Sequence, residues 1–329
     1  MIASEPQCVF CHGHACANLF PTTDIAGDTY DVFSCEDCGA WFLYPYPTSE
    51  QLNAAYDDSY YGEEDEKFEG MVERVLDYFR HNRAKRLAKW IPKHGAVLDL
   101  GCGSGGFLDA LSSCGSYKLF GIERPGKAAE RASRIPNLKL KTGELEAHDF
   151  PAASLDAVTL FHVIEHLPEP VKYLKIISNI LKPGGVLMIS YPNAGSRQAA
   201  WFKGRWLHLD PPRHLWLMPP DSLTKALEPL GFSLESEHHF SIEYNPFGYQ
   251  QSILNIFFKK RELLYEYLKG NKDYTADQPG WLLRLMKLGY ILTFPLFMLM
   301  DMVDALGKRG GTVYLVFRKT GSNTASTGK

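Results

Sequence analysis

The 329-residue sequence carries little net charge, does not begin with a basic and apolar leader, and has no uninterrupted apolar run of about 20 residues. A net charge of −3 and a sequence pI near 6.4 give no general attraction to polyanions, which weakens the case for a nucleic-acid substrate without excluding one. The opening residues MIASEPQC lack the features of a signal peptide, so we expect a cytoplasmic protein with reduced cysteines. In contrast, 45% hydrophobic and 13% aromatic residues suffice for a packed core in about two domains.

Cysteine is concentrated at the start of the chain, where five of the seven cysteines lie within the first 38 residues. Four of them form two C-x-x-C pairs: Cys8 with Cys11, and Cys35 with Cys38. Two such pairs supply the four thiolates of a zinc ribbon, and with all positions filled the zinc would be structural. We place the ribbon at residues 1–47, with a disulfide or redox pair as the alternative that a reducing compartment disfavours.

The ribbon should contain a hairpin, followed by a linker and helices over residues 48–95. Residues 29–34 alternate as a strand, and residues 40–44 can return beside it. Residues 57–69 are strongly acidic, and the basic stretch 73–93 carries apolar residues at helical intervals. We interpret that stretch as an amphipathic helix that packs on the sheet and is ended by Pro92 and Gly95, rather than as an RNA-binding surface.

The stretch 96–106, AVLDLGCGSGG, predicts a buried parallel strand that turns sharply into a helix. Glycines at Gly101, Gly103 and Gly105 allow backbone angles that a side chain would forbid, and they let a ligand approach the main chain. Gly101, Gly103 and Gly106 also fit the dinucleotide fingerprint G-x-G-x-x-G, so the turn alone leaves the cofactor open. Glu123, about 20 residues on at the end of the next strand, would accept ribose hydroxyls of either cofactor.

From residue 96 onward, strand and helix patterns alternate, which predicts an α/β fold with a doubly wound parallel sheet. Strands are predicted at residues 96–100, 118–123, 138–141, 155–161, 186–191, 232–241 and 312–318. A helical insertion over residues 245–311 precedes the last strand, and the polar tail 320–329 is expected to be disordered.

Four features together resemble class I S-adenosylmethionine-dependent methyltransferases. They are Asp99 before the first glycine, the tight G-x-G-x-G, the later Gly143-Glu144, and FHVIEHLPEP at residues 161–170. The resemblance spans residues 96–319 and implies a Rossmann-like, seven-stranded sheet whose last strand is antiparallel. It also implies that Glu144 accepts from the adenine amino group and that the amide of Leu145 reaches a ring nitrogen. The cofactor-binding residues that it implies are Asp99, Gly101, Gly103, Gly105, Glu123, Glu144, Leu145, Phe161 and His162.

The segment FHVIEHLPEP holds the densest set of titratable groups in the chain. Its H-x-x-E-H formally matches an inverted zinc-protease signature, but a strand runs into it and two prolines close it, so no continuous helix can present the histidines. It also resembles the metal-binding E-x-x-E-H of ubiquinone-biosynthesis O-methyltransferases, with His162 in place of the first glutamate. A divalent ion at Glu165 and His166 is therefore a candidate cofactor; the alternative is that both residues order a helix start.

A loop rich in aromatics and histidine, residues 201–220, follows the fifth strand and should lie over the cofactor. Its P-x-R-H-L resembles a bacterial methyltransferase group found with surface-polysaccharide and secondary-metabolite enzymes, in which an N-terminal ribbon recurs. Arg213 would hold a phosphate or carboxylate, and either His214 or His166 would take a proton from an attacking hydroxyl. A packed, hydrogen-bonded role for His214 is the alternative.

We therefore expect an enzyme that uses S-adenosylmethionine and a structural zinc to O-methylate a sugar or related polar metabolite. A zinc-ribbon RNA methyltransferase, an NAD-dependent oxidoreductase and a non-catalytic binding module remain the alternatives. Residues 281–306 are apolar, but the uncharged run 288–300 is short and Pro295 interrupts it, so no transmembrane span is expected. That segment would cover the substrate, form a homo-oligomer contact, or touch a membrane surface peripherally.

Overall fold

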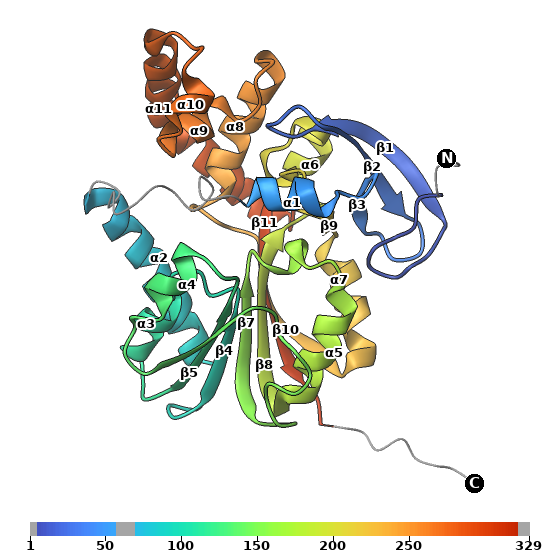
Figure 1. Cartoon of the computed structure of the whole chain (residues 1–329), viewed down its shortest axis with the longest axis vertical. Helices are drawn as coiled ribbons and strands as arrows, with labels where there is room; N and C mark the ends of the chain where they lie inside the picture. The colour runs from blue at the N-terminus through green and yellow to red at the C-terminus, as the bar shows by residue number, and fades with distance from the viewer. Residues whose placement is uncertain (1–4, 57–69, 322–329) are drawn as a thin grey trace.

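The computed structural model describes residues 5–56 and 70–321. The acidic segment at residues 57–69 and residues 322–329 of the tail lie outside the described residues, so the predictions made for them stay predictions. Figure 1 shows a central sheet with helices on both sides, a small N-terminal sheet, and a group of helices at the top of the view.

The central sheet contains every strand that the alternating pattern predicts. It is built from β4 (Ala96–Leu100), β5 (Lys118–Glu123), β6 (Leu138–Thr142), β7 (Leu155–Phe161), β8 (Leu181–Pro192), β10 (Phe232–His238) and β11 (Thr312–Lys319). The spatial order is β10-β11-β8-β7-β4-β5-β6. Only β11 runs antiparallel to its neighbours, β8 and β10, which confirms the last strand's direction and the doubly wound α/β class.

Two helical layers cover this sheet because successive side chains of a buried strand point to opposite faces. Val97 and Ala157 contribute to the core beneath one layer, and Leu98 and Val158 to the core beneath the other. The first layer is α2 (Gly70–Ala88), α3 (Gly106–Ser112) and α4 (Lys127–Ala132); the second is α5 (Pro170–Ile180) and α7 (Pro220–Leu227). The predicted helix before the first strand is thus confirmed, but it ends at Ala88 instead of near Pro92.

The N-terminal region forms a four-stranded antiparallel sheet that is continuous with a distant part of the chain. Its order is β1 (Cys16–Thr23), β2 (Thr29–Cys35), β3 (Trp41–Tyr44) and β9 (Trp216–Leu217). The hairpin strands β2 and β3 were predicted, whereas β1 and β9 were not. Because β9 belongs to the aromatic loop at residues 201–220, the ribbon is joined to that loop by a strand pairing. A short helix, α1 (Ser49–Ala55), follows with Thr48 as its N-cap.

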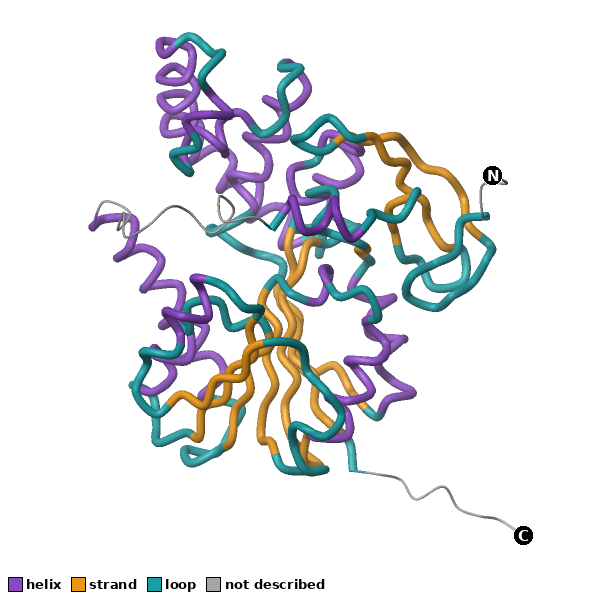
Figure 2. Tube along the Cα trace, viewed as in Figure 1, coloured by secondary structure: helices purple, strands orange, loops and turns teal. Residues whose placement is uncertain are grey.

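The remaining helices form the group at the top of Figure 1, which is purple in Figure 2. They are α6 (Arg197–Phe202), α8 (Asn245–Phe257), α9 (Leu263–Leu268), α10 (Lys272–Thr275) and α11 (Gly280–Leu306). Single 3₁₀ turns lie at Ile164–His166, Lys203–Arg205, Leu207–Leu209 and Glu228–Leu230.

The prediction that Pro295 interrupts the apolar segment was wrong, because α11 runs through it for 27 residues. Pro295 removes one backbone donor, while the packing of the opposite face of the helix against α8 and α9 supports both halves. Among the described residues, this helix alone has the length and apolar composition that crossing a membrane requires. This corrects the expectation that Pro295 and the short uncharged run keep the segment below spanning length, while the expectation that it does not cross a membrane stays a prediction.

Candidate active site

The glycine turn after β4 uses its three glycines for different purposes. All three have left-handed φ angles: 70° at Gly101, 55° at Gly103 and 77° at Gly105. A Cβ atom on Gly101 would lie 2.4 Å from Val163 Cγ2, and one on Gly105 would lie 2.4 Å from Ile135 Cδ1. A Cβ atom on Gly103 would meet no atom within 4 Å. Gly101 and Gly105 therefore allow close packing, whereas Gly103 borders open space that a ligand can fill.

Two carboxylates flank this turn, and their surroundings differ. Glu123, at the end of β5, accepts hydrogen bonds from the amide of Gly103 at 2.6 Å and from that of Arg124 at 3.0 Å. Asp99 is buried within β4 and accepts from Thr159 Oγ1 at 2.5 Å; burial raises the pKa of Asp99 to about 7. Glu123 is thus placed at the open side of the turn, and Asp99 supports the turn from below.

The predicted adenine-binding segment follows β6. Gly143 has a φ of 121° and open space beside it, and Leu145 is 2% exposed. The carboxylate of Glu144 accepts a hydrogen bond from Tyr173 Oη of α5 at 2.8 Å. This bond holds Glu144 in place from the second helical layer, a contact that the sequence did not predict.

A cavity of about 220 Å³ lies at the carboxyl ends of β7 and β8, beneath α2 and the loop that follows β10. Phe161, Ser190 and Tyr314 line it from the sheet. Arg83 of α2 enters it from above and donates to both oxygens of Glu243, at 2.5 and 2.6 Å. Sequence reasoning missed Arg83 and Glu243, which are 160 positions apart and carry no local signal.

Three side chains that were predicted singly or in pairs converge behind His162, whose Nε2 atom lies 3.2 Å from Ser190 Oγ in the wall of this cavity. One donor atom each from Glu165, His166 and His214 lies within 4.8 Å of the others. His162 adjoins the group, with its Nδ1 atom 3.4 Å from Glu165 Oε1. Both oxygens of Glu165 are buried and have no hydrogen-bond partner among the described residues. A buried carboxylate in that state is costly unless a cation compensates it.

The imidazole rings of this cluster are oriented by main-chain carbonyl groups. His214 Nδ1 lies 2.8 Å from the carbonyl oxygen of His208, and His166 Nδ1 lies 2.9 Å from that of Arg213. A carbonyl oxygen can only accept, so a hydrogen bond to it requires the proton on Nδ1 and leaves the lone pair on Nε2, as in histidines that bind metals. At His166 the hydroxyl of Tyr56 also lies 2.8 Å from Nδ1 and can accept from the same proton. Burial also lowers the pKa of His166 to about 4, so the ring is neutral at pH 7. The donor set thus fits a divalent ion.

Arg213 and His214, which were predicted to contact the substrate, both make contacts within the protein. Arg213 donates to Asp210 through Nε at 3.0 Å and Nη2 at 2.5 Å, so its guanidinium holds a carboxylate of its own chain. His214 is 9% exposed and lies 3.9 Å from Glu165 Oε1 through Nε2. The sequence left His214 either as a general base or as a packed, hydrogen-bonded histidine, and this burial favours the packed role.

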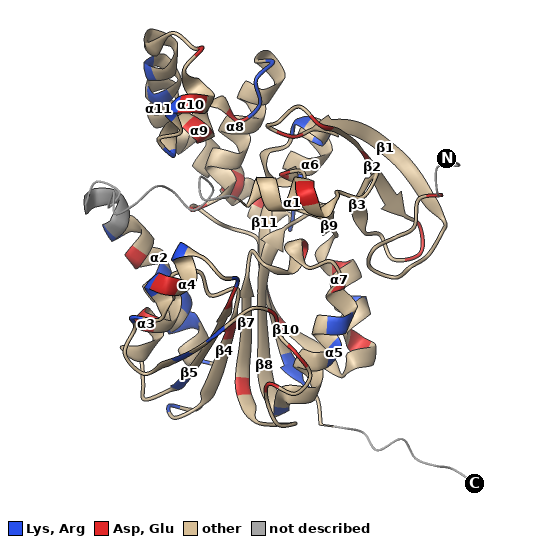
Figure 3. Ribbon diagram, in the orientation of Figure 1, with Lys and Arg blue, Asp and Glu red and all other residues tan. Residues whose placement is uncertain are grey.

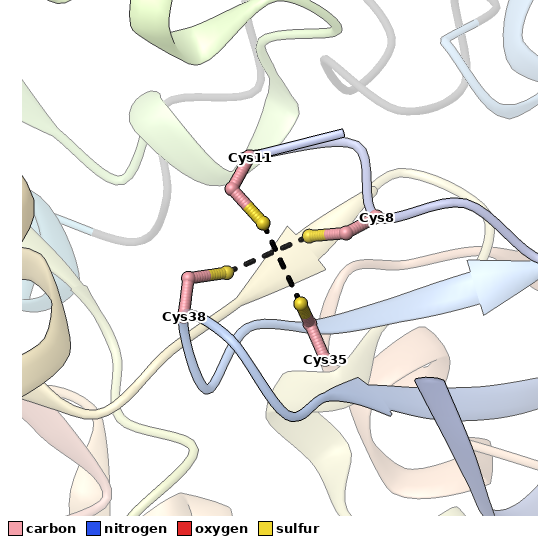
Figure 4. A group of neighbouring side chains, drawn as sticks. All are labelled: Cys8, Cys11, Cys35 and Cys38. Atoms are coloured by element: carbon pink, nitrogen blue, oxygen red, sulfur yellow. Dashed lines mark hydrogen bonds between the residues drawn. The ribbon is translucent and has the colours of Figure 1, made fainter. Parts of the chain in front are cut away.

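The four ribbon cysteines come together as the spacing predicted (Figure 4). Sγ of Cys8 lies 3.6 Å from that of Cys38, and Sγ of Cys11 lies 3.5 Å from that of Cys35. A tetrahedral zinc site with bonds of about 2.3 Å separates its sulfurs by about 3.8 Å, so the donor set fits zinc. Hydrogen bonding from Cys38 lowers the pKa of Cys8 to about 5, which favours a thiolate. All seven cysteines are free, so the arrangement supports zinc over the disulfide alternative.

The ribbon braces the histidine cluster through β9. Trp216 pairs with Phe42 of β3, and its ring lies 5.0 Å from that of Phe10 in the first cysteine knuckle. Its indole nitrogen donates to the carbonyl of Leu167 at 3.1 Å, one residue after His166. The neighbouring amide of Leu215 donates to the carbonyl of Glu165 at 2.9 Å. The ribbon is therefore part of the support of the candidate site.

The open glycine turn, the acid at the end of the next strand and the cavity beyond Phe161 all lie along the carboxyl edge of the parallel strands. That arrangement defines an open α/β protein with a nucleotide-type ligand site at the point where the strand order reverses. A family model described as a methyltransferase domain matches residues 71–237, just over half of the chain, and the chain belongs to this family. The glycine turn alone left open whether the cofactor is S-adenosylmethionine or NAD. The family match favours S-adenosylmethionine over the NAD of an oxidoreductase.

Individual relatives match over shorter stretches. A probable S-adenosylmethionine-dependent methyltransferase of Mycolicibacterium smegmatis is 31% identical over 140 residues, 42% of this chain and 52% of its own. A ubiquinone biosynthesis O-methyltransferase of Dinoroseobacter shibae is 28% identical over 169 residues, 48% of this chain and 66% of its own. The chain thus spans about half the length of the first curated relatives that it matches.

Solved structures resemble the chain in fold. A putative sarcosine dimethylglycine methyltransferase from Galdieria sulphuraria has a TM-score of 0.47 and 15% sequence identity, covering 75% of this chain and 86% of that chain.

Proposed function

We propose that this chain transfers the methyl group of S-adenosylmethionine to a hydroxyl oxygen of a sugar or related small polar metabolite. The observation that carries the proposal is the order of features along one sheet edge. Open space borders Gly103, the Glu123 carboxylate lies beside it, and the cavity begins at Phe161, at the end of the strand β7 that adjoins β4. A cofactor seated on the turn would thus point toward an acceptor in the cavity.

The chain's own groups would bind and orient both reactants. Glu123 would accept from the ribose hydroxyls, and the segment Gly143–Leu145 would contact the adenine. When bound, the cofactor supplies a methyl group on a positively charged sulfur, which is a good leaving group. The main task left to the protein is alignment, because in-line displacement requires the acceptor oxygen, the methyl carbon and the sulfur to be collinear.

The acceptor oxygen must also lose its proton, and the cluster of Glu165, His166 and His214 bears on that step. We assign these three residues as ligands of a divalent ion, which would lower the pKa of an acceptor hydroxyl as a Lewis acid. The carboxylate of Glu165, which is buried and has no hydrogen-bond partner among the described residues, supports the assignment. The predicted use of His214 or His166 as a general base is the alternative; the low pKa of His166 makes that ring a weak base.

The cavity volume favours a small acceptor over a polynucleotide. About 220 Å³ is below the range of typical drug-sized pockets and suits a single sugar or ring system. The net charge of −3 is consistent with this, since RNA-binding domains usually carry a basic surface.

Calorimetric titration with S-adenosylhomocysteine and, separately, with NAD tests the cofactor assignment. We expect the first to bind and NAD not to bind, and Glu123→Ala to reduce the S-adenosylhomocysteine affinity by about 100-fold through lost ribose hydrogen bonds. Glu235→Ala, which removes an exposed acid from the edge strand β10, is the matched control. NAD binding, or unchanged affinity in Glu123→Ala, would remove the assignment.

Incubation with isotopically labelled cofactor and fractionated cell extract, followed by mass analysis, tests the reaction. We expect a small polar molecule to gain one methyl group. Glu165→Gln keeps the shape of the side chain but removes its charge, so it should abolish metal-dependent incorporation while S-adenosylhomocysteine still binds. Incorporation that is unaffected by this variant would leave the cofactor assignment in place and refute the metal.

A further inference from the structure

The outer face of α11 is predominantly apolar, with Arg284 near one margin of it at the start of the helix. Ten large apolar side chains between Trp281 and Leu306 are each at least 48% exposed, among them Leu292 at 69% and Leu296 at 56%. At 100° per residue, all ten fall within an arc of about 140° that extends for about 37 Å along the helix. Soluble proteins rarely expose an apolar patch of this extent without a partner.

The opposite face of α11 is fixed to the rest of the molecule by buried polar contacts. Asp301 accepts from Asn245 Nδ2 at 2.7 Å and from the amide of Ser241 at 3.0 Å. Asp304 accepts from Tyr249 Oη and pairs with Arg197 Nε at 2.7 Å. These contacts set the rotation of the helix, so the apolar arc faces outward as a property of the fold.

The charges on α11, all of whose residues are described, are distributed unequally. Its exposed charged side chains are Arg284 and Lys287, while its two acids, Asp301 and Asp304, are at most 1% exposed. Figure 3 shows Lys and Arg in blue on α11. A second copy of this helix would offer no exposed acid to pair with these cations, whereas anionic lipid headgroups would.

We propose that α11 lies in the plane of an anionic lipid bilayer surface, with its apolar arc inserted at the level of the headgroups and the upper acyl chains. Amphipathic helices bind in this way by burying one face by about 5–10 Å, with attraction between basic residues and anionic lipids. A spanning orientation is disfavoured, because it would carry Asp301, Asp304 and Arg197 into the hydrocarbon region. The proposal does not depend on the proposed methyl transfer.

Flotation of the full chain with lipid vesicles tests this docking. We expect binding to vesicles of phosphatidylcholine with phosphatidylglycerol, weaker binding to phosphatidylcholine alone, and a decrease when salt is raised. The double variant Leu292→Glu/Leu296→Glu should lower the bound fraction by about tenfold or more, since two charges would enter the acyl region. Leu19→Glu, at a 40% exposed leucine of β1, is the matched control and should bind as the parent does.

A second variant separates loss of docking from loss of folding. Arg284→Glu/Lys287→Glu leaves every apolar contact in place, and it should bring binding to anionic vesicles down to the level seen with neutral ones. Thermal unfolding and sedimentation velocity of each variant are measured in parallel. Failure of the parent to float with anionic vesicles would overturn the proposal. It would also be overturned if Leu292→Glu/Leu296→Glu binds vesicles as well as the parent does. A third contradicting result is a parent protein that does not float and is a dimer in solution, with the same double variant a monomer.

Discussion

Truncation of Phe10 tests the idea that the zinc ribbon supports the histidine cluster. Phe10 lies in sequence between Cys8 and Cys11 of the four-cysteine cluster, is 4% exposed and contacts Trp216 across the ribbon surface. The indole of Trp216 in turn donates to the Leu167 carbonyl, and the amide of the preceding residue, Leu215, donates to the Glu165 carbonyl. Phe10→Ala removes the first contact in this series while leaving the cysteines and the histidine cluster unchanged.

The expected magnitude follows from the burial of the ring. Replacing a buried phenylalanine by alanine costs about 3–5 kcal/mol, from lost apolar transfer and the cavity left behind. If about 3 kcal/mol of this cost falls on the contact between the ribbon and β9, local opening of residues 213–217 becomes about 100-fold more frequent. Amide hydrogen exchange there should accelerate by that factor under native conditions.

Hydrogen exchange with peptide-level mass spectrometry measures this directly. The peptides that cover residues 164–167 and 213–217 should exchange faster in Phe10→Ala, together with those of the ribbon. Phe317→Ala is the control, because it truncates a phenylalanine that is 0% exposed in β11 and has a similar cost in global stability. Equal exchange at residues 213–217 in Phe10→Ala and Phe317→Ala would refute the bracing argument.

Two further predictions concern the glycine turn. Burial raises the pKa of Asp99 from 3.8 to about 7, so the folded state disfavours the ionised form. The resulting contribution to the free energy of unfolding is fully present below pH 3.8 and is lost as the pH rises through 7, by up to about 4 kcal/mol. Urea unfolding across this pH range should show a smaller decline for Asp99→Asn than for the parent, and equal declines would contradict the burial argument. Gly105→Ala should lower the melting temperature more than Gly103→Ala does, because only the former meets a side chain. Gly103→Ala should instead weaken S-adenosylhomocysteine binding, and the reverse pattern would contradict the division of roles.

Local pattern was sufficient where a feature depends on residues close together in the chain. The seven strands follow from short apolar runs, and the turn at Gly101–Gly105 follows from glycine spacing, because side-chain sterics act over a few residues. The pairing of Cys8 with Cys11 and of Cys35 with Cys38 follows for the same reason, since two intervening residues bring two thiolates to one metal.

The outline of the active site required contacts between distant segments. Glu165 and His214 are 49 positions apart, and nothing in either motif predicts that His214 turns toward Glu165. Arg83 reaches the cavity from a helix that precedes the first strand of the sheet, and β9 joins the ribbon after an interval of more than 170 residues. Such pairings depend on how helices and strands pack, which residue periodicity does not encode.

The helix α11 shows the same division in a single element. Its composition predicted an apolar segment, and local rules treated Pro295 as an interruption, because proline removes a hydrogen bond. Whether the helix continues was decided by its partners, since Asp301 and Asp304 are held by α8, α6 and the loop after β10. The sequence by itself determined the strands of the sheet, the glycine turn and the two cysteine pairs through short-range geometry. Only the tertiary structure decided which histidines meet Glu165 and which face of α11 stays exposed, because those depend on the packing of whole elements.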